Sequence, residues 1–419
     1  MTTTVNNEHK NIKVPNLRFP EFQGEWEKCK VSDLLDFYST NSLSWDKLEY
    51  GTTNIQNLHY GLIHVGLPTM VDIEKDNLPN IIDGNVPKNY ELCKEGDIVF
   101  ADASEDTNEV AKAVEYYNLN GKKVVCGLHT IHGRDNKNKT VVGYKGYAFS
   151  SMSFHHQIRR IAQGTKIYSI NTKNFSECYV GIPSKEEQQK IADLLRLIDE
   201  RIATQNKIIE DLKKLKSAII EKVFNGKHSE KLQLNDVGSY IRGLTYSSND
   251  VVEHGGTIVM RSNNIINGSL LDYNNNVVFV NKQMSAEQQL QNGDVVICMA
   301  NGSSSLVGKS SFYDGSCHSP ITVGAFCGIY RSKEPIVKWL FQTNKYRRYI
   351  WNSLQGGNGA IANLNGEDIL NMSFSIPNAT IKDTCVKMLT SVDSALENNM
   401  SLCALYTLQK QHLLRQMFI

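Results

Sequence analysis

Hydrophobic positions along the chain follow two different periods. Short runs rich in β-branched residues, bounded by Gly, Asn or Asp, predict strands. These runs are residues 97–100, 123–126, 140–142, 256–260, 276–280 and 294–298. In residues 184–226 and 378–419 apolar residues recur instead at heptad spacing, which predicts two long helices. Shorter helices are expected at residues 151–162 and 336–354.

The first long helix is expected to begin after Pro183, where Ser184 and Glu187 have the spacing of a capping box. Gln205 and Lys216 interrupt its apolar stripe. The stripe comprises Ile191, Leu195, Ile198, Ile202, Ile209, Leu212, Ile219 and Val223, and the second helix carries Leu389, Val392, Leu396, Cys403, Tyr406, Leu413 and Met417. A helix of roughly 40 residues is about 60 Å long and cannot bury such a stripe inside one domain. We therefore expect the two helices to pair as an antiparallel coiled coil; the alternative is that each packs on its own domain.

The chain repeats itself once. Residues 95–100 (EGDIVF) return as residues 292–297 (NGDVVI), an offset of 197, at which Gly127 matches Gly324. Asn57 aligns with Asn264, and from the two Ile-Pro steps onward the offset is 194 without a gap. The expected fold class is α+β: two β-rich domains separated by the coiled coil, in a pseudo-twofold internal repeat. The segments expected are 1–24, a domain at 25–183, a helix at 184–226, a domain at 227–377 and a helix at 378–419.

This arrangement resembles the specificity (HsdS) subunit of type I restriction–modification systems. The resemblance is carried by residues 180–195 (VGIPSKEEQQKIADLL), by Ile198 and Asp199, by residues 213–224, and by the opening LRFPEF at residues 17–22 with Trp26. It covers essentially the whole chain. The second helix departs from the pattern at residues 378–383 (NATIKD), which predicts a weaker cap there.

The resemblance implies that the two β-rich domains are target recognition domains, each for one half of a bipartite, asymmetric site on double-stranded DNA. The helices would act as the spacer. Two methyltransferase subunits, which hold S-adenosylmethionine, and restriction subunits, which use ATP and Mg²⁺, would be the partners. This chain would then have no catalytic site and no cofactor. The alternative from a different class is a two-headed coiled-coil adaptor that binds proteins.

Composition changes this picture little. The formal net charge of +1 is low for a stand-alone nucleic-acid binder, although partner subunits can neutralise phosphates. Nine cysteines without a CxxC pair indicate neither a disulfide framework nor a zinc ribbon, and they favour a reducing cytoplasm. We expect no signal peptide and no membrane span.

Polar residues that differ between the two halves are the candidate DNA contacts, because Asn and Gln suit adenine, Arg suits guanine and Asp suits cytosine. In the first half they are Asn54, Gln56, Asn57, Asp102, Ser104, Lys112 and Arg134. In the second half they are Arg261, Asn263, Asn264, Asn301, Ser303, Lys309, Arg331, Gly357 and Asn358, with Met299 opposite Asp102. Lys112 and Lys309 recur in both halves, which favours a phosphate contact or a scaffold role over base reading. The pairs Arg159-Arg160 and Arg347-Arg348 are further phosphate candidates.

Other chemistry is not expected. The segment from Gly302 to Ser310 has five residues between its glycines, whereas a phosphate-binding P-loop has four. His129 and His132 lie three apart without an acidic or Cys ligand beside them, which favours packed or loop histidines over a metal site. No catalytic residue and no metal ligand is therefore predicted.

Overall fold

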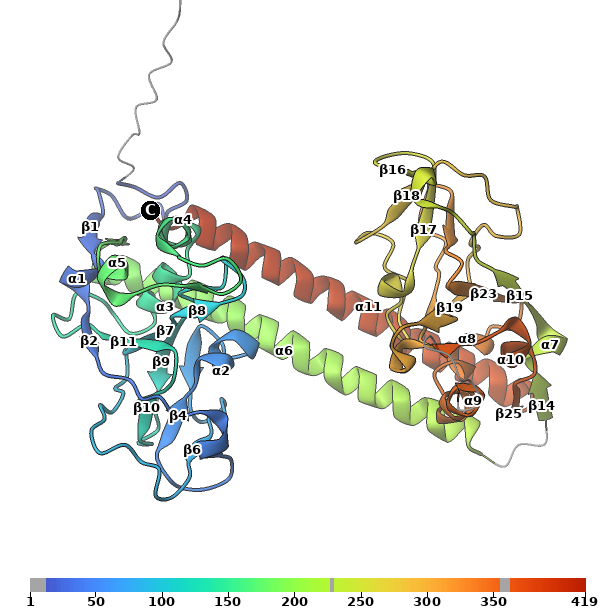
Figure 1. Cartoon of the computed structure of the whole chain (residues 1–419), viewed down its shortest axis with the longest axis horizontal. Helices are drawn as coiled ribbons and strands as arrows, with labels where there is room; N and C mark the ends of the chain where they lie inside the picture. Colours follow the sequence, from blue (N-terminus) through green and yellow to red (C-terminus); the bar gives the residue numbers. More distant parts are fainter. Residues whose placement is uncertain (1–12, 227–229, 355–361) are drawn as a thin grey trace, which may run out of the picture. The chain divides into compact units, whose positions relative to one another are not determined.

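The computed structural model describes residues 13–226, 230–354 and 362–419 (Figure 1). It consists of two compact units: the first is Met1–Asn206 with Leu402–Ile419, and the second is Lys207–Ser401. The long helices α6 (Lys185–Phe224) and α11 (Ala379–Gln416) therefore contribute one part to each unit. Within the described ranges, none of the helices has both the length and the apolar character needed to cross a bilayer.

Two sheets form the first unit. One has the order β2-β11-β7-β9-β5, and the other has the order β10-β4-β6-β3 with β10 parallel to β4. Their strands are β2 (Asp36–Tyr38), β3 (Leu48–Glu49), β4 (Gln56–Leu58), β5 (Met70–Asp72), β6 (Asn80–Ile81), β7 (Ile98–Ala101), β9 (Ala113–Asn118), β10 (Val124–Cys126) and β11 (Thr130–Arg134). Two-stranded ladders join β1 (Glu27–Lys30) to β13 (Tyr179–Ile182) and β8 (Ala103–Ser104) to β12 (Tyr168–Ser169). The helices before α6 are α1 (Val31–Leu34), α2 (Tyr60–Val65), α3 (Tyr144–Phe149), α4 (Met152–Ile161) and α5 (Thr172–Ser176).

The second unit repeats this topology. Its sheet β15-β23-β19-β21 corresponds to β2-β11-β7-β9, and its sheet β22-β17-β18-β16 corresponds to β10-β4-β6-β3, again with the first pair parallel. The strands are β14 (Glu230–Gln233), β15 (Gly238–Arg242), β16 (Val251–Val252), β17 (Thr257–Met260), β18 (Val278–Val280), β19 (Val295–Cys298), β20 (Ala300–Asn301), β21 (Ser310–Phe312), β22 (Ile321–Val323), β23 (Cys327–Ser332), β24 (Ala362–Asn363) and β25 (Ser373–Ile376). The helices before α11 are α7 (Leu234–Val237), α8 (Val337–Leu340), α9 (Asn344–Leu354) and α10 (Gly366–Leu370). The predicted internal repeat and α+β fold class are thus confirmed.

One predicted strand is wrong. Residues 140–142 form a turn that leads into α3. The backbone N–H of Thr140 donates to Asp135 at 2.8 Å, and that of Val141 donates to Gln188 on α6 at 2.9 Å. Because side chains take these donors, the segment does not join a strand ladder despite its β-branched residues.

The alignment of the two repeats also needs one correction. In the parallel pairs, Leu58 lies opposite Cys126 and Met260 lies opposite Val323. Leu58 and Met260 are therefore equivalent, an offset of 202, and the sequence pairing of Asn57 with Asn264 is wrong. The loops between the sheets differ in length, so a short match of Asn residues was misleading.

The two long helices begin with different caps. Ser184 accepts a hydrogen bond from the N–H of Glu187 at 3.3 Å, but the Glu187 carboxylate bonds the Arg18 guanidinium at 2.7 Å instead of completing the predicted box. At the start of α11, the Asn378 side chain accepts from the N–H of Ile381 at 3.2 Å. Asn378 therefore supplies a cap where the sequence suggested a weak one.

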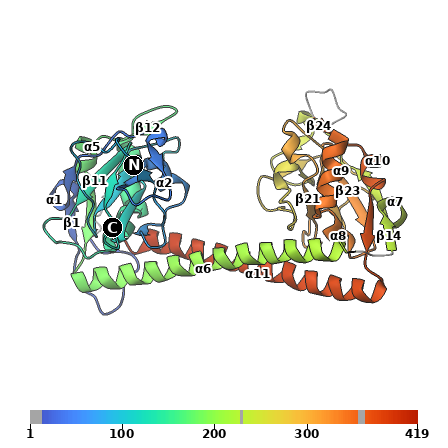
Figure 2. The same ribbon diagram turned by 90° about the horizontal axis from the view of Figure 1, so that it is seen from below.

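The helix ends are part of each unit's hydrophobic core. In the first unit Ile191 and Leu195 of α6 pack with Leu413 of α11 and Met417 beyond it, and Figure 2 shows the end of α11 beside the first turns of α6. In the second unit the last turns of α6 pack in one core with Leu389 near the start of α11. The paired halves run antiparallel within each unit, because the start of one helix meets the end of the other.

An ion pair links the helices at equivalent places in both units. Lys410 lies 2.6 Å from Asp199 in the first unit, and Lys216 lies 2.7 Å from Asp393 in the second. Asp199 also accepts from the Tyr147 hydroxyl, and Asp393 accepts from the Trp339 indole. The Lys216 that interrupts the apolar stripe therefore has a partner in the buried seam. Burial lowers its pKa, and the Asp393 charge partly opposes that shift.

We predict that Asp393→Asn destabilises the second unit by about 3–5 kcal/mol, because Lys216 is left buried without a counter-charge. The loss should be read from urea unfolding. It should shrink as the pH is raised, since Lys216 loses its proton and no longer needs the carboxylate.

The double variant Lys216→Met with Asp393→Asn serves as the control, because it removes the buried cation and keeps an acceptor for Trp339. The more exposed Lys338, 3.1 Å from Asp393, loses its partner in both variants alike. It should recover most of the lost stability. Asp199→Asn should cost less, since the Asp199 and Lys410 side chains are 20% and 19% exposed, against 5% and 7% for Asp393 and Lys216. Equal losses for both Asp→Asn variants would contradict this account.

Candidate nucleic-acid interface

An edge at the equivalent place in each unit carries residues that differ between the two units. In the first unit this edge lies at the carboxyl ends of the parallel strands β4 and β10, beside β8. In the second unit it lies at the carboxyl ends of the parallel strands β17 and β22, beside β20. Carboxyl ends of adjacent parallel strands place the following loops side by side. His59, Ser104 and His129 occupy this edge in the first unit, and their equivalents by strand register are Arg261, Asn301 and Phe326.

In the second unit this edge is hollow, with a volume of about 580 Å³. Arg261, Ser262, Asn301 and Phe326 line it. Asn301 donates to the Ser262 hydroxyl at 3.2 Å, while the Phe326 side chain is 67% exposed. A guanidinium, an amide and an exposed aromatic ring around one hollow can contact the edge and the face of a base. The predicted residues Arg261 and Asn301 are thus brought together.

The first unit has an aromatic and histidine cluster at the equivalent edge. The ring centroids of Trp45 and His59 are 4.5 Å apart, and those of Tyr60 and His129 are 5.2 Å apart. The exposed His129 has a positive φ of 54° and lies 3.1 Å from the Asp102 carboxylate. Burial raises the pKa of Asp102, and the nearby His129 opposes that rise. An Asp–His pair beside aromatic rings offers hydrogen-bonding chemistry different from that of the second unit.

A helix with basic residues flanks each edge. In the first unit Arg159 of α4 donates to Asn108, in the loop that follows Ser104, at 2.9 Å. In the second unit the Tyr346 hydroxyl of α9 donates to the Gly308 carbonyl, in the loop that follows Asn301, at 2.8 Å. The predicted phosphate candidates Arg160, Arg347 and Arg348 are exposed on these helices. Cations beside a polar edge suit contacts to the DNA backbone.

Three predicted contacts have internal roles instead. Asn57 is fully buried and accepts from the Asn41 side chain at 2.7 Å, and the buried Gln56 donates to the Leu78 carbonyl. Asn264 is 1% exposed and accepts from the N–H of Arg261 at 2.9 Å. Because these side chains lie beneath the surface, we withdraw them as base contacts.

Arg134 and Arg331 are likewise structural. Each guanidinium forms two bonds of 2.7–2.8 Å to a buried Asp, Asp97 or Asp294, and a third bond to the equivalent backbone carbonyl. Burial acts to raise the pKa of Asp97, but hydrogen bonds from His132 and Arg134 outweigh it and lower that pKa. Their recurrence in both repeats, with the same partners, fits a scaffold function and not base reading.

The remaining candidates differ in their position. Asn54 lies at the opposite end of β4 and bonds Asp83 at 2.9 Å, so the structure does not bring it to the edge. Lys112 pairs with Glu109 at 2.8 Å, and Lys309 occupies the equivalent place. Asn263 and Ser303 are exposed beside Arg261 and Asn301, whereas Met299 is buried. Gly357 and Asn358 lie outside the described residues.

Sequence reasoning missed the edge residues His59, Tyr60, His129 and Phe326. All four directly follow, or lie close after, a strand of the parallel pair. Only His129 follows a β-branched run that the sequence marked, residues 123–126; the strands before His59, Tyr60 and Phe326 are three residues long and gave no such signal.

We predict that Arg134→Ala lowers the stability of the first unit by about 3–5 kcal/mol, because Asp97 is then a buried carboxylate without its cation. Hydrogen exchange of the β7 and β11 amides would measure this locally. The difference from wild type should shrink as pH falls through the lowered pKa of Asp97, since protonation abolishes the pair in wild type too.

Arg331→Ala is the matched variant and should cost less, because the Arg331 side chain is 22% exposed, against 8% for Arg134. If Arg134→Ala leaves amide protection unchanged but weakens DNA binding, the structural role is wrong and Arg134 contacts a base.

Comparison with known proteins identifies relatives of the chain. The profile of a family described as the type I restriction modification DNA specificity domain matches residues 24–214 and 227–402. The chain is 27% identical over 209 residues to a putative type I restriction enzyme MjaX specificity subunit of Methanocaldococcus jannaschii, covering 49% of this chain and 46% of that protein. It is 33% identical over 158 residues to the type I restriction enzyme EcoKI specificity subunit of Escherichia coli, covering 35% and 31%. These matches thus span less than half the length of either relative.

Solved structures show a similar fold over nearly the whole chain. The S subunit of a type I restriction–modification system from M. genitalium superposes with a TM-score of 0.60 at 15% identity, covering 97% of this chain and 99% of that one. A chain from a study of complex assembly and conformational transition in the type I system gives a TM-score of 0.50 at 13% identity, covering 93% and 96%. At these identities the likeness concerns the fold alone.

Proposed function

Because the chain belongs to the type I restriction–modification DNA specificity family, we propose that its two units read the two blocks of a split, asymmetric DNA site. The chain itself would transfer no methyl group and cut no DNA. Those reactions would belong to methyltransferase subunits with S-adenosylmethionine and to restriction subunits with ATP and Mg²⁺, in the cytoplasm where the DNA lies.

One observation carries this proposal. The two units share their strand order, their register and the Asp97–Arg134 type of ion pair, yet differ at the same edge. His129 and Asp102 stand where Phe326 and Met299 stand in the other unit. A constant scaffold with a divergent edge suits two domains that bind different DNA sequences. Catalytic side chains, in contrast, would be expected to recur in both units.

The long helices support the proposed roles of spacer and partner site. At 40 and 38 residues they would extend about 60 Å, enough for half-sites about one turn of B-DNA apart, roughly 34 Å. In the first unit Leu405 and Leu408 of α11 are 61% and 60% exposed. Exposed leucines on a helix fit an interface with another protein, for which we propose the methyltransferase subunits.

The proposal is tested by mapping methylated adenines in a host that expresses this chain with its methyltransferase. The expected motif is two short blocks separated by unspecified bases. A continuous motif would contradict the two-reader arrangement. The coiled-coil adaptor would be favoured if the chain supports no methylation, shows no salt-sensitive DNA binding and captures other proteins instead.

We predict that Arg261→Ala relaxes one block of the motif and leaves the other unchanged. Loss of a guanidinium contact to a base should reduce discrimination at one position by about 1–3 kcal/mol. Binding to duplexes substituted base by base measures this. Lys231→Ala, which removes an exposed cation on the separate β14–β25 ladder, should leave every position as it was.

A second prediction concerns the spacer. Seven residues inserted after Asn206 in α6 and before Cys403 in α11, two residues in contact at 3.4 Å, preserve the heptad register. Each helix gains about 10 Å, or about three base pairs at 3.4 Å each. The unspecified gap should lengthen while both blocks stay the same. The same insertion at the exposed turn of Asn138 should leave the gap unchanged, and altered blocks in the helix variant would argue against a spacer.

A further inference from the structure

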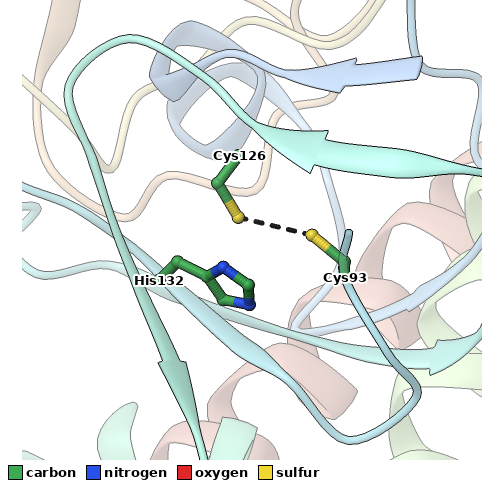
Figure 3. A group of neighbouring side chains, drawn as sticks. All are labelled: Cys93, Cys126 and His132. Carbon is green, nitrogen blue, oxygen red and sulfur yellow. Dashed lines mark hydrogen bonds between the residues drawn. The ribbon is translucent and has the colours of Figure 1, made fainter. Parts of the chain in front are cut away.

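The interior of the first unit brings together three side chains that can bind metal: Cys93, Cys126 and His132 (Figure 3). Cys93 precedes the turn before β7, Cys126 ends β10 and His132 lies on β11. Their ligand atoms all lie within 4.8 Å of one another. We propose that these residues form a structural zinc site, independent of the DNA-reading function.

His132 is oriented as a metal ligand. Its Nε2 lies 2.7 Å from the Asp97 carboxylate, which can only accept when ionised, so the ring proton sits on Nε2. Nδ1 then carries a lone pair, and this buried atom has no hydrogen-bond partner among the residues that the structure describes. A histidine held through one nitrogen by a carboxylate, with the other nitrogen available, is the arrangement found at zinc sites. Without a ligand, a buried and unpaired Nδ1 costs free energy.

The sulfur atoms are placed for a shared ion. Figure 3 shows the Cys93 and Cys126 thiols pointing toward each other with the imidazole beside them, and the sulfurs are 3.4 Å apart. Two thiolates bound tetrahedrally to zinc at 2.3 Å lie about 3.8 Å apart. A disulfide would need about 2.05 Å. A small relaxation therefore suffices for zinc.

The charges balance in this dry interior. Zn²⁺ with two thiolates and a neutral imidazole has no net charge, and the Asp97 carboxylate is already paired with Arg134. A soft, neutral N/S ligand set suits zinc over magnesium or calcium. These three side chains leave the fourth position of a tetrahedral zinc ion open. Because zinc binds thiolates, binding would release the thiol protons and would weaken at low pH.

The second unit supplies an internal comparison. At the offset of 197, Leu290, Val323 and Ile329 replace Cys93, Cys126 and His132. All three are buried in one apolar cluster, and Ile329 keeps the strand register of His132. Asp294 and Arg331 retain their ion pair there. The same fold thus packs without any ligand at these places, so packing alone does not demand two thiols and an imidazole together in the first unit.

The test measures metal in the full-length chain by inductively coupled plasma mass spectrometry, after purification under reducing conditions and incubation with Zn²⁺. Wild type should hold about one zinc per chain. The variant Cys93→Leu with Cys126→Val and His132→Ile, which installs the residues of the second unit, should hold almost none. Co²⁺ in place of Zn²⁺ should give the visible absorption of a thiolate-bound tetrahedral ion in wild type alone.

Two further measurements keep the outcome clear. The control variant Cys298→Ala with Cys327→Ala removes two buried thiols of the second unit and should retain the zinc. A chelator should lower the melting temperature of wild type but not that of the triple variant, and the measurement on wild type does not depend on whether the variant folds. Any one of three results would overturn the proposal. They are wild type that holds no zinc after incubation, a Cys93–Cys126 disulfide under reducing conditions, and metal retained by the triple variant.

Discussion

Each unit is completed by helix turns from the opposite half of the chain, and the rest of the fold depends on that exchange. The Asp199–Lys410 and Asp393–Lys216 pairs lie where these turns meet, and each carboxylate is also bonded by an aromatic side chain of its β-rich domain. The buried Lys216 and Asp393 tolerate few other arrangements, because either charge alone would be costly, and the partly exposed Asp199 and Lys410 are constrained less strongly. The pairs therefore specify which helix faces meet as much as they stabilise the contact.

On this shared frame the two edges have diverged. The Asp–Arg pair keeps the same three bonds in both units, while the side chains of the edge changed from His59 and His129 to Arg261 and Phe326. Divergence also reached the interior, where Cys93, Cys126 and His132 occupy the places of three aliphatic residues. Surface and core of the first unit have thus both departed from the second unit while strand order and register persisted.

Much of the fold could be predicted, because it rests on periodicity. The heptad stripes, the 194-residue offset and most β-branched runs appear in the structure as expected. The edge was harder, since it is made by strand pairing over long sequence separations: Cys126 and Leu58 meet although 68 positions separate them in number. Arg134 and Asn57 looked like base readers because polarity in sequence does not reveal burial. The Cys93, Cys126 and His132 cluster was invisible for the same reason, as its spacing matches no local metal motif.

The placement of Leu402–Ile419 in the first unit has a consequence for how the chain is made. Leu413, Met417 and Phe418 belong to a core whose other members were synthesised some two hundred or more residues earlier. During translation the N-terminal half must therefore wait, with part of its apolar surface uncovered, until the ribosome has released the last turns of α11. A premature stop codon within the region that encodes residues 402–419 would consequently injure the half that was translated first.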